Sequence, residues 1–275
     1  MTIRFGCQTY TWQMSGERYL GELDRIIGVA ADAGFSGLEC EIQFLGKLRD
    51  PALMQSVLDK TGIDFAAMCI VSNWHGRTEN DAERAETDFA IEYLSRNFPD
   101  TILNIVPLAD PDHDDLAARQ NNHIAIINDI AKRAAARGLK AVYHPNSVPG
   151  STCITRDDYR KMLDGIDSTV VGWCPDIYHI KAGGMEPLEM LREYRDLIRH
   201  VHYSDLDETL TPQAMGHGIM DYPAITQFLA QTDYDGWLVV EDHCKWAETD
   251  PDAVTRSNGR YFTDKLAPAV LQAIK

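Results

Sequence analysis

The sequence predicts an α/β protein, a single (β/α)8 TIM barrel that occupies residues 1–275 as one domain. Three observations lead to this prediction. Short apolar segments alternate with longer amphipathic ones, there are eight of the short segments, and no stretch rich in Pro, Gly or Ser divides the chain. Repeated β-α units form a parallel sheet with right-handed crossovers, and eight strands favour closure into a barrel over an open doubly wound sheet.

The apolar segments have the composition of parallel strands that are buried on both faces. They are short, rich in Val, Ile and Cys, and apolar at successive positions, as expected for strands covered on both sides. The predicted strands are 3–7, 37–40, 65–70, 102–106, 141–144, 170–174, 200–204 and 237–241.

The segments between the strands carry helical patterns. Apolar residues recur at helical spacing over 20–30, and a glycine follows to end that helix. A second helix is predicted over 117–136, and Thr155 followed by acidic residues reads as a helix start. Residues 253–274 suit a closing helix that Pro268 kinks or splits.

The charge of the chain excludes some classes of partner. The formal net charge of the 275 residues is -16, and so acidic a surface repels phosphate backbones and anionic membranes. No apolar run approaches the roughly 20 residues needed to span a bilayer. The first residues lack a cationic region followed by an apolar one, so no signal peptide is expected. Neither a nucleic acid nor a membrane is therefore expected as a partner.

The six cysteines form no CxxC pair, and most lie in or beside apolar strand segments. They are expected to be buried thiols in a reducing cytoplasm, which makes the cytoplasm the expected location. A cysteine nucleophile is the alternative. The sequence also contains no glycine-rich nucleotide-binding loop.

Four predicted strands end in side chains of the kind that bind metals: His144, Asp176, His202 and Glu241. Each is about one β-α unit from the next, so they come from neighbouring strands. In a barrel the C-terminal ends of the strands meet at one rim, where catalytic groups lie. Imidazole and carboxylate together suit Mn, Co, Zn, Mg or Fe, so the pattern predicts one divalent metal ion.

Each of these residues also has a structural interpretation. An Asp at a strand end often only caps the next helix, and a single His in a strand is more often a hydrogen-bonded core residue. Glu241 is harder to explain in this way, because a carboxylate that follows the apolar run 237–240 would be costly unless paired or ligated. The recurrence at one topological position favours metal binding.

The same residues carry a family resemblance. The chain resembles the sugar isomerase/epimerase superfamily with xylose-isomerase-like barrels over essentially its whole length, nearest in pattern to the inosose dehydratase-like branch. The resemblance rests on an Asp-x-x-His element, a His-Val-His element and a Gly-Trp-Leu-Val-Val-Glu element, in this order. The segments that carry it are 5–12, 34–39, 175–179, 199–202, 216–221 and 234–241.

The resemblance implies a set of site residues. Asp176, His202 and Glu241 match metal-ligand positions, and His179 matches a histidine beside the metal and the substrate. In many relatives the fourth ligand is a glutamate at the end of strand 5. Here that position is Val142, and His144 lies two residues on, on the same face of the strand. His144 is therefore either the fourth ligand or a base.

The resemblance also implies a reaction. It indicates an isomerase or epimerase that acts on a keto-sugar by proton abstraction next to the carbonyl, through a metal-bound enediolate. Glu241 is the expected base, with His144 or His179 acting on the other side. The alternative is a lyase that dehydrates a keto-cyclitol or keto-sugar, since an imidazolium can protonate a departing hydroxyl near neutral pH. A nuclease and a non-catalytic sugar-binding barrel are weaker alternatives.

Further rim residues are expected to contact a small sugar or cyclitol. Aromatic rings stack on sugar faces and Asn can bridge two hydroxyls, although loop packing explains such residues equally well. The substrate-binding candidates are Trp12, Asn73, His75, Asn104 and His217. Glu39 and Glu41 alternate with Cys40, so one of them is expected to face the barrel interior. Assembly into a homo-oligomer is left open by the sequence.

Overall fold

The structure, a computed structural model, describes residues 3–110 and 115–273. These residues form two compact units. The first unit contains residues 3–66 and 201–273, and the second contains 67–110 and 115–200. Whether 1–275 forms one domain stays a prediction.

Four parallel strands make up the sheet of the first unit. Their order is β2-β1-β10-β7. The next strand, β3 (Asp64–Ser72), starts beside β2, because the backbone N–H of Asp64 donates to Ser36 O at 2.9 Å. In this register Val239 pairs with His202, and Cys7 pairs with Val240. The strands are β1 (Arg4–Gln8), β2 (Gly37–Glu41), β7 (Val201–Tyr203) and β10 (Trp237–Val240).

The sheet of the second unit continues from β3, in the order β3-β4-β5-β6, and is again parallel. Its strands are β3 (Asp64–Ser72), β4 (Ile102–Pro107), β5 (Ala141–Tyr143) and β6 (Val171–Trp173). All eight predicted strands are confirmed, with ends that differ by a few residues. The sequence did not predict the small antiparallel pair of β8 (Asp205–Leu206) and β9 (Pro212–Gln213), because two-residue strands are too short to show a periodicity.

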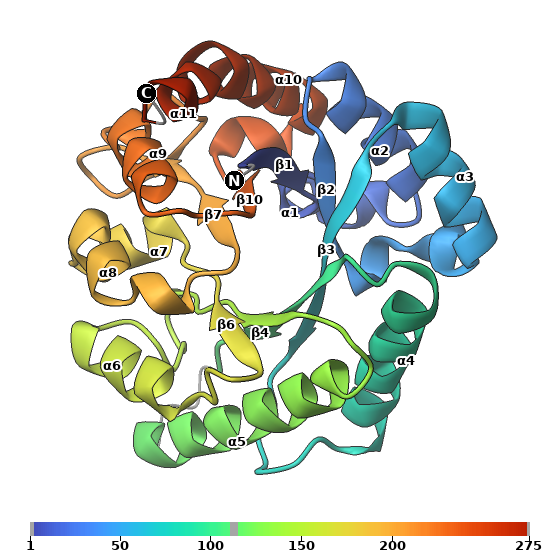
Figure 1. The fold of residues 1–275 in the computed structure, drawn as a ribbon, viewed down its shortest axis with the longest axis vertical. Coiled ribbons are helices and arrows are strands. Elements are labelled where there is room, and N and C mark those ends of the chain that lie inside the picture. The colour runs from blue at the N-terminus through green and yellow to red at the C-terminus, as the bar shows by residue number, and fades with distance from the viewer. Residues whose placement is uncertain (1–2, 111–114, 274–275) are drawn as a thin grey trace. The chain divides into compact units, whose positions relative to one another are not determined.

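The helices of the first unit include α2, which packs beside β2, and α3, which packs against α2 (Figure 1). They are α1 (Tyr10–Gln13), α2 (Leu23–Asp32), α3 (Pro51–Thr61), α9 (Tyr222–Gln231), α10 (Pro251–Tyr261) and α11 (Ala267–Ala273). The short helices are η1 (Gly16–Tyr19), η2 (Ile42–Phe44), η3 (Gly46–Arg49), η5 (Lys245–Glu248) and η6 (Phe262–Leu266).

The predicted closing helix is divided, as Pro268 suggested, but the break precedes the proline. The π-helical turn η6 separates α10 from α11, and Pro268 lies in the first turn of α11. Proline is tolerated there, whereas its ring and its missing N–H disturb the turn before it. Ile274, the last residue of the predicted helix, lies outside the described residues.

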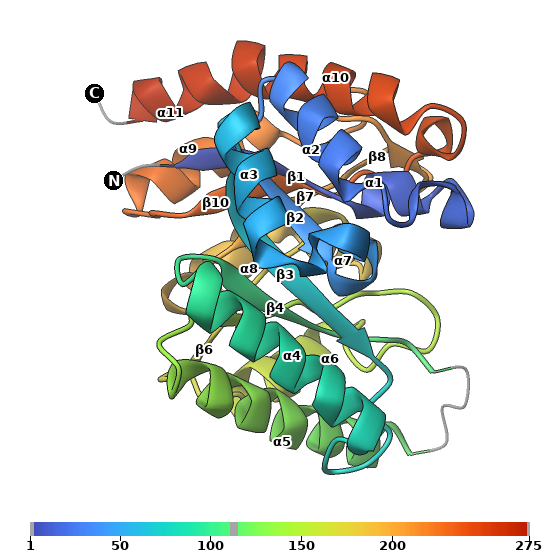
Figure 2. The same ribbon diagram turned by 90° about the vertical axis from the view of Figure 1, so that its right-hand side faces the viewer.

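The helices of the second unit include two long neighbours, α4 and α5, which Figure 2 shows side by side. The predicted helix start at Thr155 is confirmed, because its side chain accepts from Asp158 N while Asp158 accepts from Thr155 N. The helices are α4 (Asp81–Asn97), α5 (Leu116–Ala135), α6 (Arg156–Gly165), α7 (Ile177–Ala182), α8 (Pro187–Glu193) and the short η4 (Arg195–Leu197).

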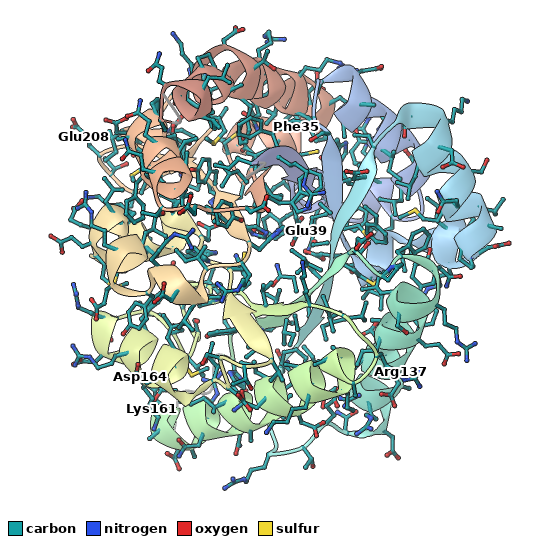
Figure 3. The ribbon with its side chains drawn as sticks, in the orientation of Figure 1. Phe35, Glu39, Arg137, Lys161, Asp164 and Glu208 are labelled. Atoms are coloured by element: carbon teal, nitrogen blue, oxygen red, sulfur yellow. The ribbon has the colours of Figure 1, made fainter. Side chains whose placement is uncertain are left out.

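Buried aromatic rings and thiols fill the packing layers. In the first unit the ring of Phe262 contacts Phe5 and Phe35, with ring centroids 5.3 and 5.4 Å away, and Figure 3 labels Phe35. All six cysteines are buried thiols outside any disulfide, as predicted. Burial raises the pKa of the Cys7 and Cys40 thiols, which disfavours the reactive thiolate and gives a cysteine nucleophile no support. Among the described residues, no helix is long and apolar enough to cross a bilayer.

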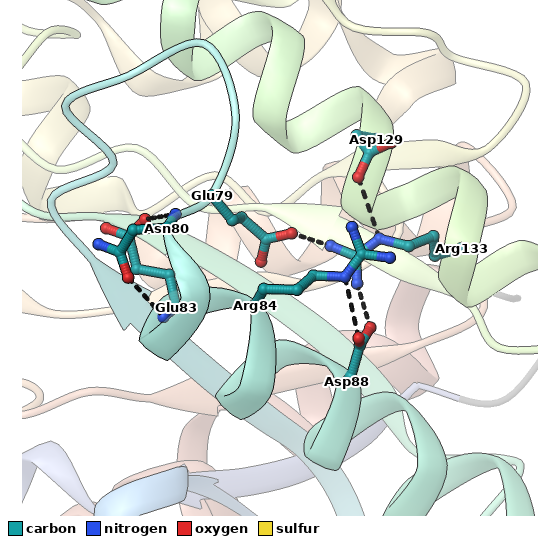
Figure 4. A network of polar contacts seen from close by, with 7 residues as sticks. All are labelled: Glu79, Asn80, Glu83, Arg84, Asp88, Asp129 and Arg133. Atoms are coloured by element: carbon teal, nitrogen blue, oxygen red, sulfur yellow. Dashed lines mark hydrogen bonds and ion pairs between the residues drawn. The ribbon is translucent and has the colours of Figure 1, made fainter.

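An arginine cluster ties α4, α5 and the loop after β3 together in the second unit (Figure 4). Arg133 of α5 forms ion pairs with Glu79 of the loop and Asp88 of α4, and its Nε lies 3.0 Å from Asp129 Oδ2. The Arg133 side chain is 18% exposed and that of Glu79 only 3%, so this pair is largely withdrawn from water. The cluster therefore anchors the loop that carries Asn73 and His75.

Replacing Arg133 by Met is expected to lower the free energy of unfolding by about 3 kcal/mol, because the buried Glu79 carboxylate would lose its cation. Urea unfolding at neutral pH measures this loss. Arg84→Met is the matched control, since Arg84 is exposed and forms an ion pair with the exposed Asp88 at 2.9 Å, and it should change the midpoint little. Equal effects of the two substitutions would contradict the anchoring role.

Candidate active site

The ring of His202 lies between two carboxylates in the first unit. Its Nδ1 is 2.6 Å from Glu241 Oε2, and its Nε2 is 2.9 Å from Glu39 Oε2. The strand ends produce this arrangement: His202 is on β7, Glu241 directly follows β10, and its N–H donates to Tyr203 O at 3.0 Å. Glu39 is on β2, and all three side chains are buried. Figure 3 labels Glu39 on the side of β2 away from α2 and α3.

This geometry is chemically demanding. A neutral imidazole has one N–H, so it can donate to only one of the two carboxylates. The lone pair of its other nitrogen would then face a carboxylate oxygen, which is repulsive unless a second proton lies between them or a metal cation coordinates both atoms. Metal-ligating histidines commonly donate their other N–H to a carboxylate. His202 therefore fits a ligand that donates from Nε2 to Glu39 and presents Nδ1 beside Glu241 Oε2.

In the second unit the ends of β5 and β6 bring His144, Asp176 and His179 together. Asp176 caps α7 by accepting from His179 N at 3.1 Å through Oδ1, and its Oδ2 is 3.9 Å from His144 Nε2. The rings of His144 and His179 are in contact, with centroids 5.8 Å apart, and Ser147 Oγ is 2.9 Å from His179 Nδ1. All three predicted residues are buried. This group offers further imidazole and carboxylate ligands.

Two predicted substrate contacts occupy buried positions. Trp12 is fully buried, and its indole N–H donates to Asp252 Oδ1 at 2.9 Å, at the start of α10. This position favours packing over stacking on a sugar. Asn104 is also fully buried, on β4, where its backbone pairs with Cys69 and Val142 of the neighbouring strands.

The other three predicted contacts are exposed on loops. In the second unit, Asn73 and His75 follow β3, and His75 Nδ1 lies 2.9 Å from Asp110 Oδ2. In the first unit, His217 lies in a loop that folds around the buried Asp205 carboxylate, which accepts from Gly216 N and Gly218 N, both at 3.0 Å. Substrate contact by Asn73, His75 and His217 stays a prediction.

Glu39 and Glu41 both lie in the interior of the first unit, whereas the sequence predicted only one of them there. Residues two apart on a strand share a face, so the two must go together. Burial raises the pKa of Glu41 to about 7, a hydrogen bond from Gln43 opposes this, and the charges of Glu241 and Glu39 add to it. The spacing of two glutamates two positions apart in an apolar strand segment could have predicted that both are buried.

The stability of the metal-free protein is expected to fall as pH rises from about 4.5 to 7. In this window Glu41 keeps its proton in the folded protein, whereas the same residue in the unfolded chain has lost it. Each rise in pH therefore favours the unfolded chain, until the pH passes the folded pKa of Glu41. Glu41→Gln removes this titration. The free energy of unfolding of the variant, minus that of the wild type, should therefore be about 3 kcal/mol larger at pH 8 than at pH 4. Urea unfolding in a chelator measures this difference. A difference that does not change with pH would contradict the shift.

Comparison with known proteins agrees with this architecture. Residues 27–265 match the family model for the xylose isomerase-like TIM barrel. The inosose dehydratase of Clostridium tetani (strain Massachusetts / E88) is 28% identical over 159 residues, which are 51% of this chain and 53% of that protein. The chain thus spans about half the length of the curated relatives it matches.

Solved structures show the same fold along nearly the whole chain. IolI protein with a bound zinc atom has a TM-score of 0.76 at 14% identity, over 97% of this chain and 99% of that one. An L-ribulose 3-epimerase has a TM-score of 0.75 at 18% identity, over 99% of this chain and 97% of that one. The predicted (β/α)8 barrel is confirmed, and the chain belongs to the xylose isomerase-like TIM barrel family.

Proposed function

We propose that this chain is a metal-dependent lyase that dehydrates a keto-cyclitol or keto-sugar, starting with removal of the proton next to the carbonyl. The observation that carries the proposal is His202 held between Glu39 and Glu241, with Nδ1 only 2.6 Å from Glu241 Oε2. Such a pair of adjacent donor atoms suits a divalent cation. The zinc atom bound by IolI protein, a barrel of the same fold, supports this part of the proposal.

The proposed ligands are His202 and Glu241 with His144 and Asp176. In barrels of this type the C-terminal ends of the strands form one rim, and each of these residues lies on or just beyond its strand. Imidazoles and carboxylates in this proportion suit Zn, Mn, Co, Fe or Mg. When bound, the ion would polarise the substrate carbonyl and so make the neighbouring C–H more acidic.

Different side chains are proposed to remove the substrate proton and to protonate the departing hydroxyl. Glu241 is the proposed base, and Glu39 keeps the His202 ring in place. His144 or His179 is the proposed acid for the departing hydroxyl, since a histidine exchanges its proton near neutral pH. Ser147, 2.9 Å from His179 Nδ1, would hold that ring in position.

Dehydration is the favoured outcome because β5 lacks a second carboxylate. Its central residue is the fully buried Val142, and His144 follows the strand. Returning a proton to the opposite face of the same carbon, as an epimerase must, needs a second carboxyl group or equivalent proton donor on that face, whereas elimination needs an acid at the departing hydroxyl. The similarity to inosose dehydratases supports this choice. Isomerisation or epimerisation, which the sequence favoured, is the second candidate because of the likeness to L-ribulose 3-epimerase.

The test is a panel of keto-cyclitols and keto-sugars, incubated in D2O with the enzyme loaded in turn with each divalent ion. Dehydration gives an ultraviolet-absorbing enone and loss of water. Isomerisation or epimerisation instead incorporates deuterium beside the carbonyl without an enone. If no ion supports either exchange or enone formation with any member of the panel, the proposal is wrong.

A further inference from the structure

Three polar side chains gather at the carboxyl end of β2 in the first unit, and we call them the amide–carboxyl cluster: Glu41, Gln13 and Gln43. Glu41 is the last residue of β2, Gln43 lies in η2, and Gln13 ends α1. Glu41 shares a strand face with Glu39, whose carboxylate contacts His202, and it is two residues nearer the carboxyl end. The cluster therefore lies beside the proposed base, on the side from which substrate enters a barrel of this kind.

Glu41 has an unusual set of partners for a buried acid. Its carboxyl group accepts from Gln43 Nε2, and with the Gln13 amide nitrogen turned toward it, that nitrogen lies 2.6 and 2.8 Å from its two oxygens. Glu41 is only 6% exposed, yet no Lys, Arg or His of the described residues forms an ion pair with it. Buried carboxylates are normally paired with cations, so the fold alone does not account for Glu41 here.

The cluster matches the chemistry of a polyol. A carboxylate offers about four lone-pair sites, and the two amides supply three contacts, so the carboxyl group retains acceptor capacity. An amide presents both a donor and an acceptor, as a hydroxyl does. Gln43 is exposed, which leaves one side of the cluster open to solvent.

We propose that Glu41, together with Gln13 and Gln43, binds hydroxyl groups of the polyol substrate beside the carbon that Glu241 deprotonates. Glu41 is then a specificity-determining residue, one that selects substrates with a hydroxyl in this position. This inference rests on the proposed function, because it uses Glu241 as the reference point for the substrate.

The binding test uses myo-inositol, a cyclitol without a carbonyl, titrated by calorimetry into the metal-loaded full chain. Glu41→Gln and Gln43→Leu should each weaken binding about tenfold or more, which corresponds to about 1.4 kcal/mol. Gln55→Leu is the matched control, because Gln55 is an exposed glutamine on α3 whose amide donates to Asp59 Oδ1 at 2.7 Å. Because Gln43 is exposed, Gln43→Leu should unfold at the wild-type temperature and bind the wild-type amount of metal.

The kinetic test compares a keto-cyclitol with its monodeoxy analogues. Glu41→Gln should raise KM for the parent about tenfold, and the effect should disappear for the analogue that lacks the bound hydroxyl. An equal effect on every analogue, or wild-type binding of myo-inositol that neither substitution changes, overturns the inference. Wild-type enzyme that binds myo-inositol through Glu41 but turns over no keto-polyol would instead refute the proposed reaction and leave the binding site standing.

Discussion

Glu241→Gln is expected to lower turnover of the substrate about 10³-fold. Glutamine has nearly the size and shape of glutamate but cannot accept a proton, and general-base catalysis typically contributes about 10² to 10⁴ in rate. Glu241 directly follows β10, and its backbone N–H donates to Tyr203 O, so the substitution should leave the strand pairing intact. Steady-state kinetics and exchange of the substrate proton in D2O should fall together, because both require the same C–H cleavage.

The control for this result is Glu248→Gln. Glu248 is exposed in η5, a few residues beyond Glu241, and should keep wild-type turnover. Since Glu241 is also a proposed ligand, metal content is measured alongside activity at saturating metal. Retention of more than a tenth of the turnover with a full complement of metal would show that Glu241 is not the base.

A graded loss of metal affinity is expected from His202→Ala and Glu39→Gln. Removing an outer-shell partner of a ligating histidine typically costs about 10- to 100-fold in affinity, so Glu39→Gln should lie in this range. The His202 Nε2 to Glu39 Oε2 contact of 2.9 Å is the bond that would weaken. His202→Ala removes a direct ligand and leaves two buried carboxylates without their shared imidazole, so its loss should exceed that of Glu39→Gln.

Competition with a chromophoric chelator measures these affinities. Glu22→Gln, an exposed glutamate at the start of α2, is the matched control and should bind metal as the wild type does. An unchanged affinity in Glu39→Gln would mean that Glu39 does not orient the ring. An unchanged affinity in His202→Ala would remove His202 from the ligand set.

The strand frame, the family and the short list of strand-end residues could all be predicted from the sequence. These features are local, because the alternation of apolar segments with helical patterns follows from neighbours in the chain. The residues at the strand ends follow from the same pattern, which is why His202 and Glu241 were predicted and are in contact in the structure. The Asp176 cap of α7 and its proximity to His144 also lie within reach of such reasoning.

Which side chains share an environment could not be predicted from the sequence, because it depends on the folded chain. The contact of Glu39 with His202 joins residues 163 positions apart, and no periodicity reports on such a pair. The same holds for Trp12, whose indole bonds Asp252 240 positions away and is buried in packing. Glu41 acquired its raised pKa from burial and from Gln43, Glu241 and Glu39 together. Side-chain environment depends on segments brought together by folding, so the sequence could identify the metal-binding residue types but not the hydrogen bonds that position them.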